Sequence, residues 1–295
     1  MPFEKGYLLF GLTAAIIYAI AASSLKTASD RGAKSLHTTL IANIVTAFAF
    51  MAFVPWTSGR IFPQTWWPSI IVGVLFAAGQ LCTVLALSRG HASVATPVMG
   101  SKAVIVAFTL VLFGRPIGIP VWIGALLTSI GIAVLAFQRE KGARGMAPSI
   151  IFALLAALFF AVFDALTQLW SPGITFGRLI PWAMLISAVA TVPPLLIMNR
   201  GLPALPRQAI GYLALGVALL TTQSLILIWS IGAFSDAAGL NVVYGSRGIW
   251  SVLVVWMFGH HFSKDERFTG TGTVVRRLAA ASLIAAAIVL VFVFR

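Results

Sequence analysis

The sequence predicts an all-α integral membrane protein with ten transmembrane helices, arranged as two inverted five-helix repeats. Three observations lead to this prediction: a composition too apolar for a soluble domain, apolar runs of membrane-span length, and motifs that recur in both halves. The 295 residues are 60% hydrophobic and 9% charged, whereas soluble domains carry about 25% charged residues. The mean hydropathy of +1.00 therefore indicates a chain that lies mostly in lipid.

Composition also narrows the classes of function. The net charge of +13 would suit a nucleic-acid partner, but the 20 Lys and Arg residues are scattered between apolar runs. We therefore expect no nucleic-acid binding. Cys82 is the single cysteine, and no Cys/His cluster has metal-ligand spacing. Without a Walker-type phosphate loop either, we expect neither an enzyme nor a bound cofactor.

Each predicted span is an apolar run close to the roughly 20 residues that cross a bilayer. In chain order the runs are 7–27, 36–56, 67–88, 92–113, 119–137, 149–170, 177–198, 208–231, 235–258 and 275–294.

Turn-forming residues separate these runs and justify their ends. The breaks that we use are Asp30-Arg31-Gly32, Thr57-Ser58-Gly59, Arg89-Gly90-His91, Gly114-Arg115-Pro116, Ser171-Pro172-Gly173 and Asn199-Arg200-Gly201. Tryptophans at several span ends fit the aromatic belt of a membrane interface.

The fourth and ninth spans carry the same motif. Gly100-Ser101-Lys102 is followed twelve residues after the lysine by Gly114, and Gly245-Ser246-Arg247 is followed twelve residues after the arginine by Gly259. A cation therefore stands at the same depth of the same helix in each half. Charged residues inside the membrane are costly, so such a pair marks a functional site.

Other matches extend the repeat over much of the chain. Tyr18-Ala19 corresponds to Phe160-Ala161 at an offset of 142, and Gln80 to Gln223 at an offset of 143. We predict a first repeat over 1–138, a linker over 139–147 and a second repeat over 148–295. Because five spans are an odd number, the second repeat enters the membrane from the opposite side, as in many secondary transporters.

The stretch from Ala86 to Phe137 resembles the ten-helix EamA-like branch of the drug/metabolite transporter superfamily. Its matching segments are 92–98, Leu112-Phe113-Gly114 and 124–127. The resemblance implies a secondary transporter, an exporter or exchanger, in the cell (inner) membrane, acting as a monomer or homodimer. Its partners would be a small-molecule substrate, the lipid bilayer, and a coupling proton or counter-substrate. Members usually have a glutamate where Arg115 follows the glycine, so the role of that glutamate is not carried over.

The candidate substrate site centres on Lys102 and Arg247. At 1.5 Å per residue, about ten residues into a span is roughly 15 Å deep, so both side chains must face protein or a wet cavity. Ser101 and Ser246 are small neighbours that leave open space. Two cations facing such a cavity favour an anion, and arginine matches carboxylate or phosphate geometry. A small organic anion or anionic amphiphile is therefore the expected substrate.

Asp164 keeps an alternative open, because it is the acid placed deep in a span. It is able to pair with Lys102, Arg247 or Lys26 for packing alone, to couple a proton, or to bind the cationic group of an exported amino acid or cationic or aromatic drug. Gln80, Gln223 and Tyr244 are further candidates for the same site, with interhelical hydrogen bonding as their structural alternative. A lipid flippase or a non-transporting membrane scaffold remains a rival interpretation.

The orientation of the chain rests on two conflicting arguments. Lys and Arg are more frequent in the loops after odd-numbered spans than at the termini and in the other loops. The positive-inside rule then places both termini outside, whereas the family resemblance implies termini inside.

Overall fold

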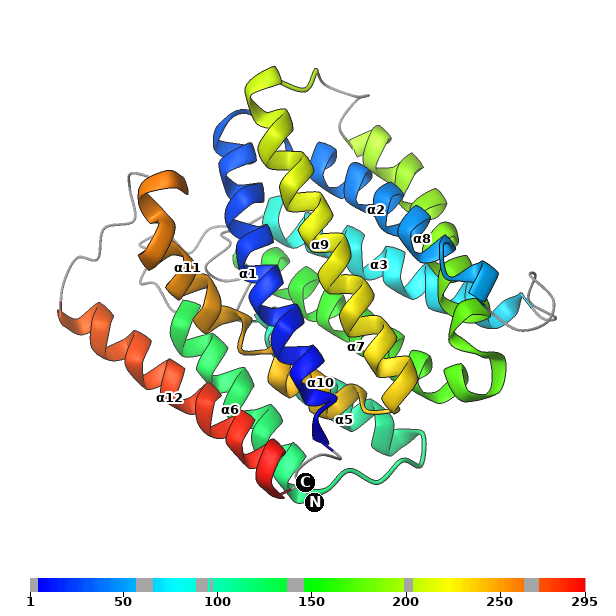
Figure 1. The fold of residues 1–295 in the computed structure, drawn as a ribbon, viewed down its shortest axis with the longest axis vertical. Helices are drawn as coiled ribbons and strands as arrows, with labels where there is room; N and C mark the ends of the chain where they lie inside the picture. The colour runs from blue at the N-terminus through cyan, green and yellow to red at the C-terminus, as the bar shows by residue number, and fades with distance from the viewer. Residues whose placement is uncertain are drawn as a thin grey trace.

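The computed structural model describes residues 5–56, 66–88, 95, 98–136, 146–198, 204–262 and 271–294, and over these residues the regular structure is helical (Figure 1). In lipid every backbone polar group needs a partner within the protein, and a helix supplies it within each segment. In chain order the helices are α1 (Leu8–Asp30), α2 (Ser35–Met51), η2 (Val54–Trp56), α3 (Trp67–Ser88), α5 (Lys102–Leu112), α6 (Ile119–Ala136), α7 (Met146–Ile174), α8 (Phe176–Met198), α9 (Arg207–Phe234), α10 (Ala237–Tyr244), α11 (Arg247–Phe262) and α12 (Thr271–Phe294).

Five of these helices, α1, α3, α7, α8 and α9, are long and apolar enough to cross a membrane by length and composition. Four shorter apolar stretches lie in α2, α5, α6 and α12. The ends of α3, α6 and α8 fall within one residue of the predicted ranges. Of the predicted linker 139–147, residues 139–145 lie outside the described residues, and the last two begin α7.

Two predicted spans are not single helices. The range 235–258 is divided into α10 and α11 at Gly245-Ser246, and in the range 92–113 helix α5 starts only at Lys102, after a turn at Gly100-Ser101. In the second break, the backbone N–H of Ser246 donates to Val243 O, three residues back, at 3.0 Å. An unbroken α-helix would use the residue four back, so the chain tightens and changes direction here.

The predicted turn at Ser171-Pro172-Gly173 is wrong. Helix α7 continues through Pro172 to Ile174, and the reversal occurs at Thr175, whose φ of +72° lies in the left-handed region. Pro172 has no N–H and therefore cannot donate to the carbonyl oxygen of Gln168, but the helix still closes at its end, where the N–H of Thr175 donates to Ser171 O at 3.0 Å.

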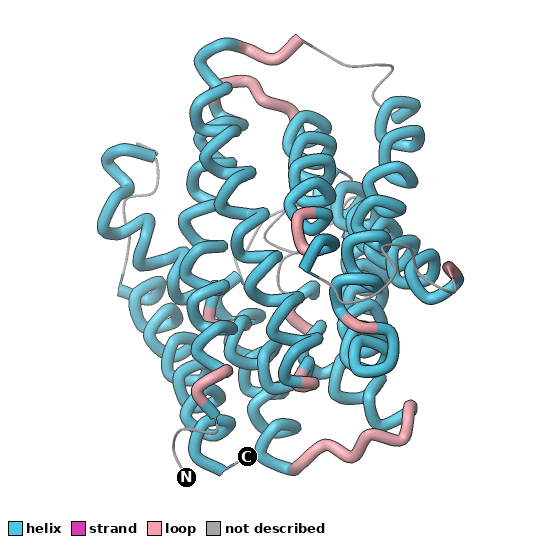
Figure 2. Tube along the Cα trace, turned by 45° about the vertical axis from the view of Figure 1, so that its right-hand side comes forward, coloured by secondary structure: helices cyan, strands magenta, loops and turns pink. Residues whose placement is uncertain are grey.

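The helices of the first and second halves interleave instead of forming separate bundles. Helix α1 packs along α9, α3 along α7 and α8, α2 on α8, and α6 along α12. Figure 1 shows α1 beside α9 and α6 beside α12, and Figure 2 shows the helices as closely packed rods in a view turned by 45°. A side chain at Gly131 would meet Ile284 at 2.6 Å, so α6 approaches α12 closely through a position without a side chain.

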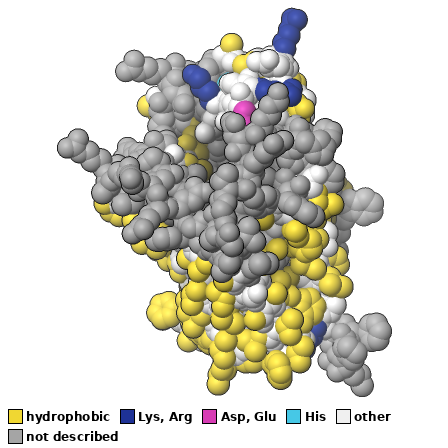
Figure 3. Space-filling model, turned by 90° about the vertical axis from the view of Figure 1, so that its left-hand side faces the viewer, with side chains coloured by type: hydrophobic (Ala, Val, Ile, Leu, Met, Phe, Trp, Pro, Cys, Tyr) yellow, Lys and Arg dark blue, Asp and Glu magenta, His cyan; other side chains and the backbone are white. Residues whose placement is uncertain are grey.

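Helix α1 begins and α12 ends at the same end of the molecule (Figures 1 and 2). Lys5 Nζ donates to the carbonyl oxygen of Val293 at 3.2 Å and ties these two ends together. In the view of Figure 3, apolar side chains cover much of the lower described surface, while most visible Lys and Arg side chains lie at the upper end. This distribution suits a lipid-embedded body with charged ends.

Candidate functional site

A central cavity of about 250 Å³ lies between the helices of the two halves. Its walls come from α1, α2, α3 and α5 on one side of the sequence and from α7, α9, α10 and α11 on the other. The volume is just below the range of about 300–1,000 Å³ of drug-sized ligand sites. A small metabolite fits this space better than a large drug.

The two predicted cations follow directly after the helix breaks at Gly100-Ser101 and Gly245-Ser246, and both line this cavity. Lys102 is the first residue of α5 and Arg247 is the first residue of α11. Both helices therefore begin at the cavity, where the positive ends of their dipoles add to the side-chain charges. A cationic side chain and the positive end of a helix dipole repel each other. An anion bound nearby would relieve this repulsion, so the arrangement favours an anion.

The second break depends on the absence of a side chain at Gly245. A Cβ atom there would collide with the methyl group of Thr128 on α6. Thr128 is fully buried, and its hydroxyl donates to the carbonyl oxygen of Val242 at 3.5 Å. The turn between α10 and α11 is thus pressed against α6, which fixes where α11 and Arg247 begin.

Lys102 is neutralised within the protein. Its Nζ atom lies 2.7 Å from Oδ2 of Asp164, and the lysine and aspartate side chains are 17% and 3% exposed. The same Oδ2 accepts a hydrogen bond from Asn241 Nδ2 at 2.6 Å. Asn241 is itself fixed by a second bond to Ala237 O at 2.8 Å. Ion pairing is therefore the structural role of Asp164 in this conformation.

Arg247 has a different environment, made of aromatic rings. Its Cζ atom lies 5.2 Å from the ring centroid of Tyr18 and 4.6 Å from that of Tyr244. The two tyrosine rings meet edge to face at 6.0 Å. Among the described residues, no carboxylate forms an ion pair with Arg247. The Arg247 side chain also hydrogen-bonds the side chain of Tyr244. Neither this bond nor the cation–π contacts cancel its positive charge, so the guanidinium can bind an anion through its other donors.

The sequence correspondence between the two halves suggests why the surroundings of the two cations differ. Lys102 Nζ lies 5.8 Å from the centroid of Phe160, just as Arg247 lies over Tyr18, and Phe160 corresponds to Tyr18 in sequence. Asp164 follows Phe160 by one helical turn. The residue one turn after Tyr18 is Ala22, so by sequence correspondence the position that supplies an acid to Lys102 is an alanine on α1.

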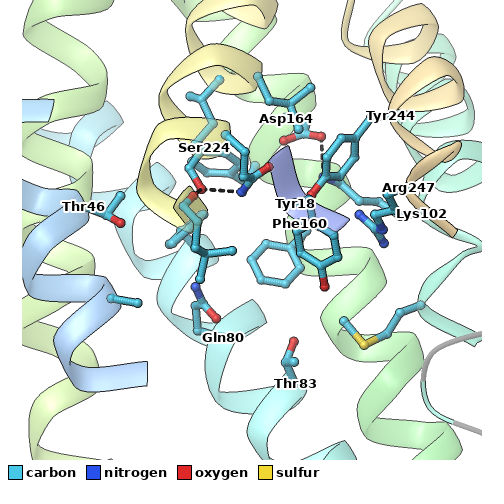
Figure 4. Close-up of a pocket in the computed structure, with 18 of the residues that line it drawn as sticks. Tyr18, Thr46, Gln80, Thr83, Lys102, Phe160, Asp164, Ser224, Tyr244 and Arg247 are labelled. Carbon is cyan, nitrogen blue, oxygen red and sulfur yellow. Dashed lines mark hydrogen bonds and ion pairs between the residues drawn. The ribbon is translucent and has the colours of Figure 1, made fainter. Parts of the chain in front are cut away.

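The opposite side of the cavity presents amides and hydroxyls. Figure 4 shows Gln80, Ser224 and Thr46 across from Lys102 and Arg247, with the rings of Tyr18 and Phe160 between them. Gln80 Nε2 donates to Asn43 Oδ1 at 3.4 Å, and Gln223 Nε2 donates to Ser224 Oγ at 2.7 Å. Gln223 Oε1 is buried with no partner in the described part of the chain.

Six of the eight predicted site residues therefore meet at one cavity: Lys102, Arg247, Gln80, Gln223, Asp164 and Tyr244. The two predicted serines do not line it. Ser101 Oγ donates to Val98 O at 2.7 Å inside its turn. Ser246 is 1% exposed, and its hydroxyl has no partner among described residues. Both serines belong to the breaks beside the cavity, not to its wall.

Sequence reasoning missed several lining residues, including Thr46, Thr83, Ser224, Phe76 and Phe163. Phe160 was also missed as a site residue, although its correspondence to Tyr18 was visible in the repeat. The hydroxyl residues carry no such signal, because a single Ser or Thr in an apolar helix is compatible with many positions. No group of three His, Cys, Asp or Glu capable of holding a metal occurs among the described residues.

Comparison with known proteins agrees with this architecture. Residues 5–137 match the family model of the EamA-like transporter family, which confirms the resemblance seen in the sequence. A protein known from a crystal structure is similar in fold over 97% of this chain and 96% of its own, with a TM-score of 0.75 and 19% sequence identity. No curated protein matches the chain.

The class of protein follows from these findings. The apolar helices and the family match indicate a multi-pass integral membrane protein. EamA-like proteins are transporters and not enzymes, so this family match indicates a membrane transporter of small molecules.

Proposed function

We propose that this protein is a secondary transporter that moves a small organic anion across the cell (inner) membrane, as an exporter or exchanger. The observation that carries the proposal is Arg247, which lines a central cavity without an ion-pair partner among the described residues. A desolvated guanidinium is costly in a low-dielectric site unless an anion joins it. Carboxylate and phosphate match its planar donors.

The mechanism that we propose is alternating access between two inverted five-helix repeats. The packing of the helices supports it. If α1 corresponds to α7, α3 to α9 and α5 to α11, then the contact of α1 with α9 corresponds to that of α7 with α3. The contact of α1 with α11 likewise corresponds to that of α7 with α5. A site between such repeats changes its access when one repeat rocks against the other.

The cation-exporter alternative requires Asp164 to be free for the substrate. Its Oδ2 is already engaged by Lys102 and Asn241, so an incoming ammonium would have to displace a resident lysine. The scaffold alternative requires a closed, packed interior, whereas the cavity has polar groups on several walls. Both observations favour anion transport.

A thermal-shift screen of the purified protein tests the proposal. Metabolites are grouped as anions, neutral compounds and cations of similar size. We expect stabilisation by one or more small anions, since a ligand that binds only the folded state raises its stability. Stabilisation confined to cations would contradict the proposal and favour a substrate at Asp164.

A further inference from the structure

We propose that Asp164 sets the valence of the accepted anion: by holding Lys102, it leaves Arg247 as a single free cation, so that the site selects a monoanion. This inference rests on the proposed function, because it concerns the same cavity. Asp164 is then a specificity-determining residue that acts through Lys102 without touching the substrate.

The contacts of Asp164 make it a fixed internal counter-ion. Its side chain is 3% exposed, with Lys102 Nζ at 2.7 Å and Asn241 Nδ2 at 2.6 Å from the same oxygen. Both donors bind the same carboxylate oxygen, so Asp164 is held in place as the ion-pair partner of Lys102. It therefore balances the charge of Lys102, and a substrate could use that cation only by displacing Asp164 from it.

The charge balance of the cavity follows directly. Its charged lining residues within the described chain are Lys102, Arg247 and Asp164, so two cations and one acid leave a net charge of +1. A monoanion at Arg247 completes the neutralisation. A dianion would bring a second carboxylate into a low-dielectric space whose other cation is already paired, and that carboxylate would lose its hydration without compensation.

The surroundings of Arg247 can be compared with those of Lys102 within the same protein. Asp164 lies one turn after Phe160, whose ring neighbours Lys102, while Ala22 lies one turn after Tyr18, whose ring neighbours Arg247. Ala22 is partly buried on α1. The difference between these two positions accounts for one free cation instead of two or none.

Isothermal titration with isosteric probes tests the proposal on the full chain. In a rigid series, terephthalate, 4-carbamoylbenzoate and terephthalamide share a shape and carry two, one and no negative charges. In a flexible series, succinate, succinamate and succinamide do the same. We expect the wild-type protein to bind the monoanion at least tenfold more tightly than the dianion or the neutral diamide in one or both series.

Variants of the pair then separate charge from structure. Asp164→Asn releases Lys102, and we expect the dianion to gain at least tenfold in affinity relative to the monoanion. The double variant Lys102→Gln/Asp164→Asn returns the net charge to +1, and we expect the wild-type preference to return with it. A merely structural role of Asp164 would lower the melting temperature of both variants but would not reverse the preference between probes.

A second comparison avoids the buried pair and serves if Asp164→Asn does not fold. If Ala22 corresponds to Asp164, as the sequence offset predicts, Ala22→Asp brings a carboxylate towards Arg247, and Ala22→Asn adds the same volume without charge. We expect the aspartate variant to bind the monoanion at least tenfold more weakly than the asparagine variant. Equal affinities of these two variants would overturn the inference.

The failures of the two proposals are distinguishable. If the wild-type monoanion binding depends on Arg247 but Asp164→Asn leaves the dianion-to-monoanion ratio unchanged, the valence inference is wrong and the anion site stands. If no monoanion of either series binds, or if Arg247→Gln binds it equally well, the proposed function fails and the inference falls with it.

Discussion

Replacing Arg247 with glutamine removes the guanidinium while keeping a polar side chain of intermediate length. Arg247 is the cavity cation without a resident carboxylate among the described residues. A hydrogen bond to a charged group contributes about 1.5–3 kcal/mol, and each 1.4 kcal/mol changes an affinity tenfold. We therefore expect Arg247→Gln to weaken binding of an anion identified in the charge-sorted screen by roughly 10- to 150-fold.

Arg247→Lys sharpens this prediction, because it keeps the charge but loses the planar fork and its stacking between Tyr18 and Tyr244. We expect an intermediate loss of affinity. Isothermal titration and uptake into proteoliposomes give the affinity and the transport rate.

Arg31 supplies the matched control for these variants. Its Cζ lies 4.1 Å from the ring of Tyr212, and its guanidinium donates to the Tyr212 hydroxyl at 3.2 Å, but it does not line the cavity. Arg31→Gln should leave anion binding unchanged. Unaltered affinity in Arg247→Gln, or an equal loss in Arg31→Gln, would refute the assignment of Arg247 as the anion-binding residue.

Three further predictions follow from the same geometry. Lys102→Gln should lower the melting temperature more than Arg247→Gln does, because it leaves Asp164 buried without its ion-pair partner. Such a loss costs about 3–5 kcal/mol in proteins. An equal melting temperature of the two variants would show that the pair is weak. Gly245→Ala should destabilise the protein by about 1–3 kcal/mol through overpacking against Thr128. Adding Thr128→Ser removes the colliding methyl group and should recover part of the lost melting temperature. The distribution of Lys and Arg predicts external termini, so a C-terminal alkaline phosphatase fusion should be active and a fluorescent protein fusion dark, whereas the reverse result would support internal termini.

The sequence located the helices well because apolar length is the quantity that a bilayer constrains. The predicted range 67–88 coincides with α3, and 119–137 and 177–198 each differ from α6 and α8 by one residue. The length of the apolar runs does not predict the breaks at Gly100-Ser101 and Gly245-Ser246. Small residues are common in transmembrane helices, so these pairs signal a break only once the packing is seen, as at Gly245 against Thr128.

Six of the predicted residues line the cavity of the candidate site, but their pairing was not predictable. The recurrence of a Gly-Ser-cation motif identified Lys102 and Arg247, and the repeat identified Gln80 and Gln223. The partner of Asp164 was left open among Lys102, Arg247 and Lys26, because it depends on the rotation of α7 about its axis. Ser101 and Ser246 were wrongly grouped with the lining residues for the same reason, since neighbours in sequence face different sides of a helix.

A structure with a heavy-atom carboxylate measures the central claim most directly. Crystals grown with 4-iodobenzoate would locate the iodine by its anomalous scattering and the carboxylate from the surrounding density. We predict one site in the central cavity, with the carboxylate against the guanidinium of Arg247 and with Lys102 still paired to Asp164. A carboxylate bound elsewhere, with Arg247 unoccupied in a cavity that the ligand can reach, would contradict the account.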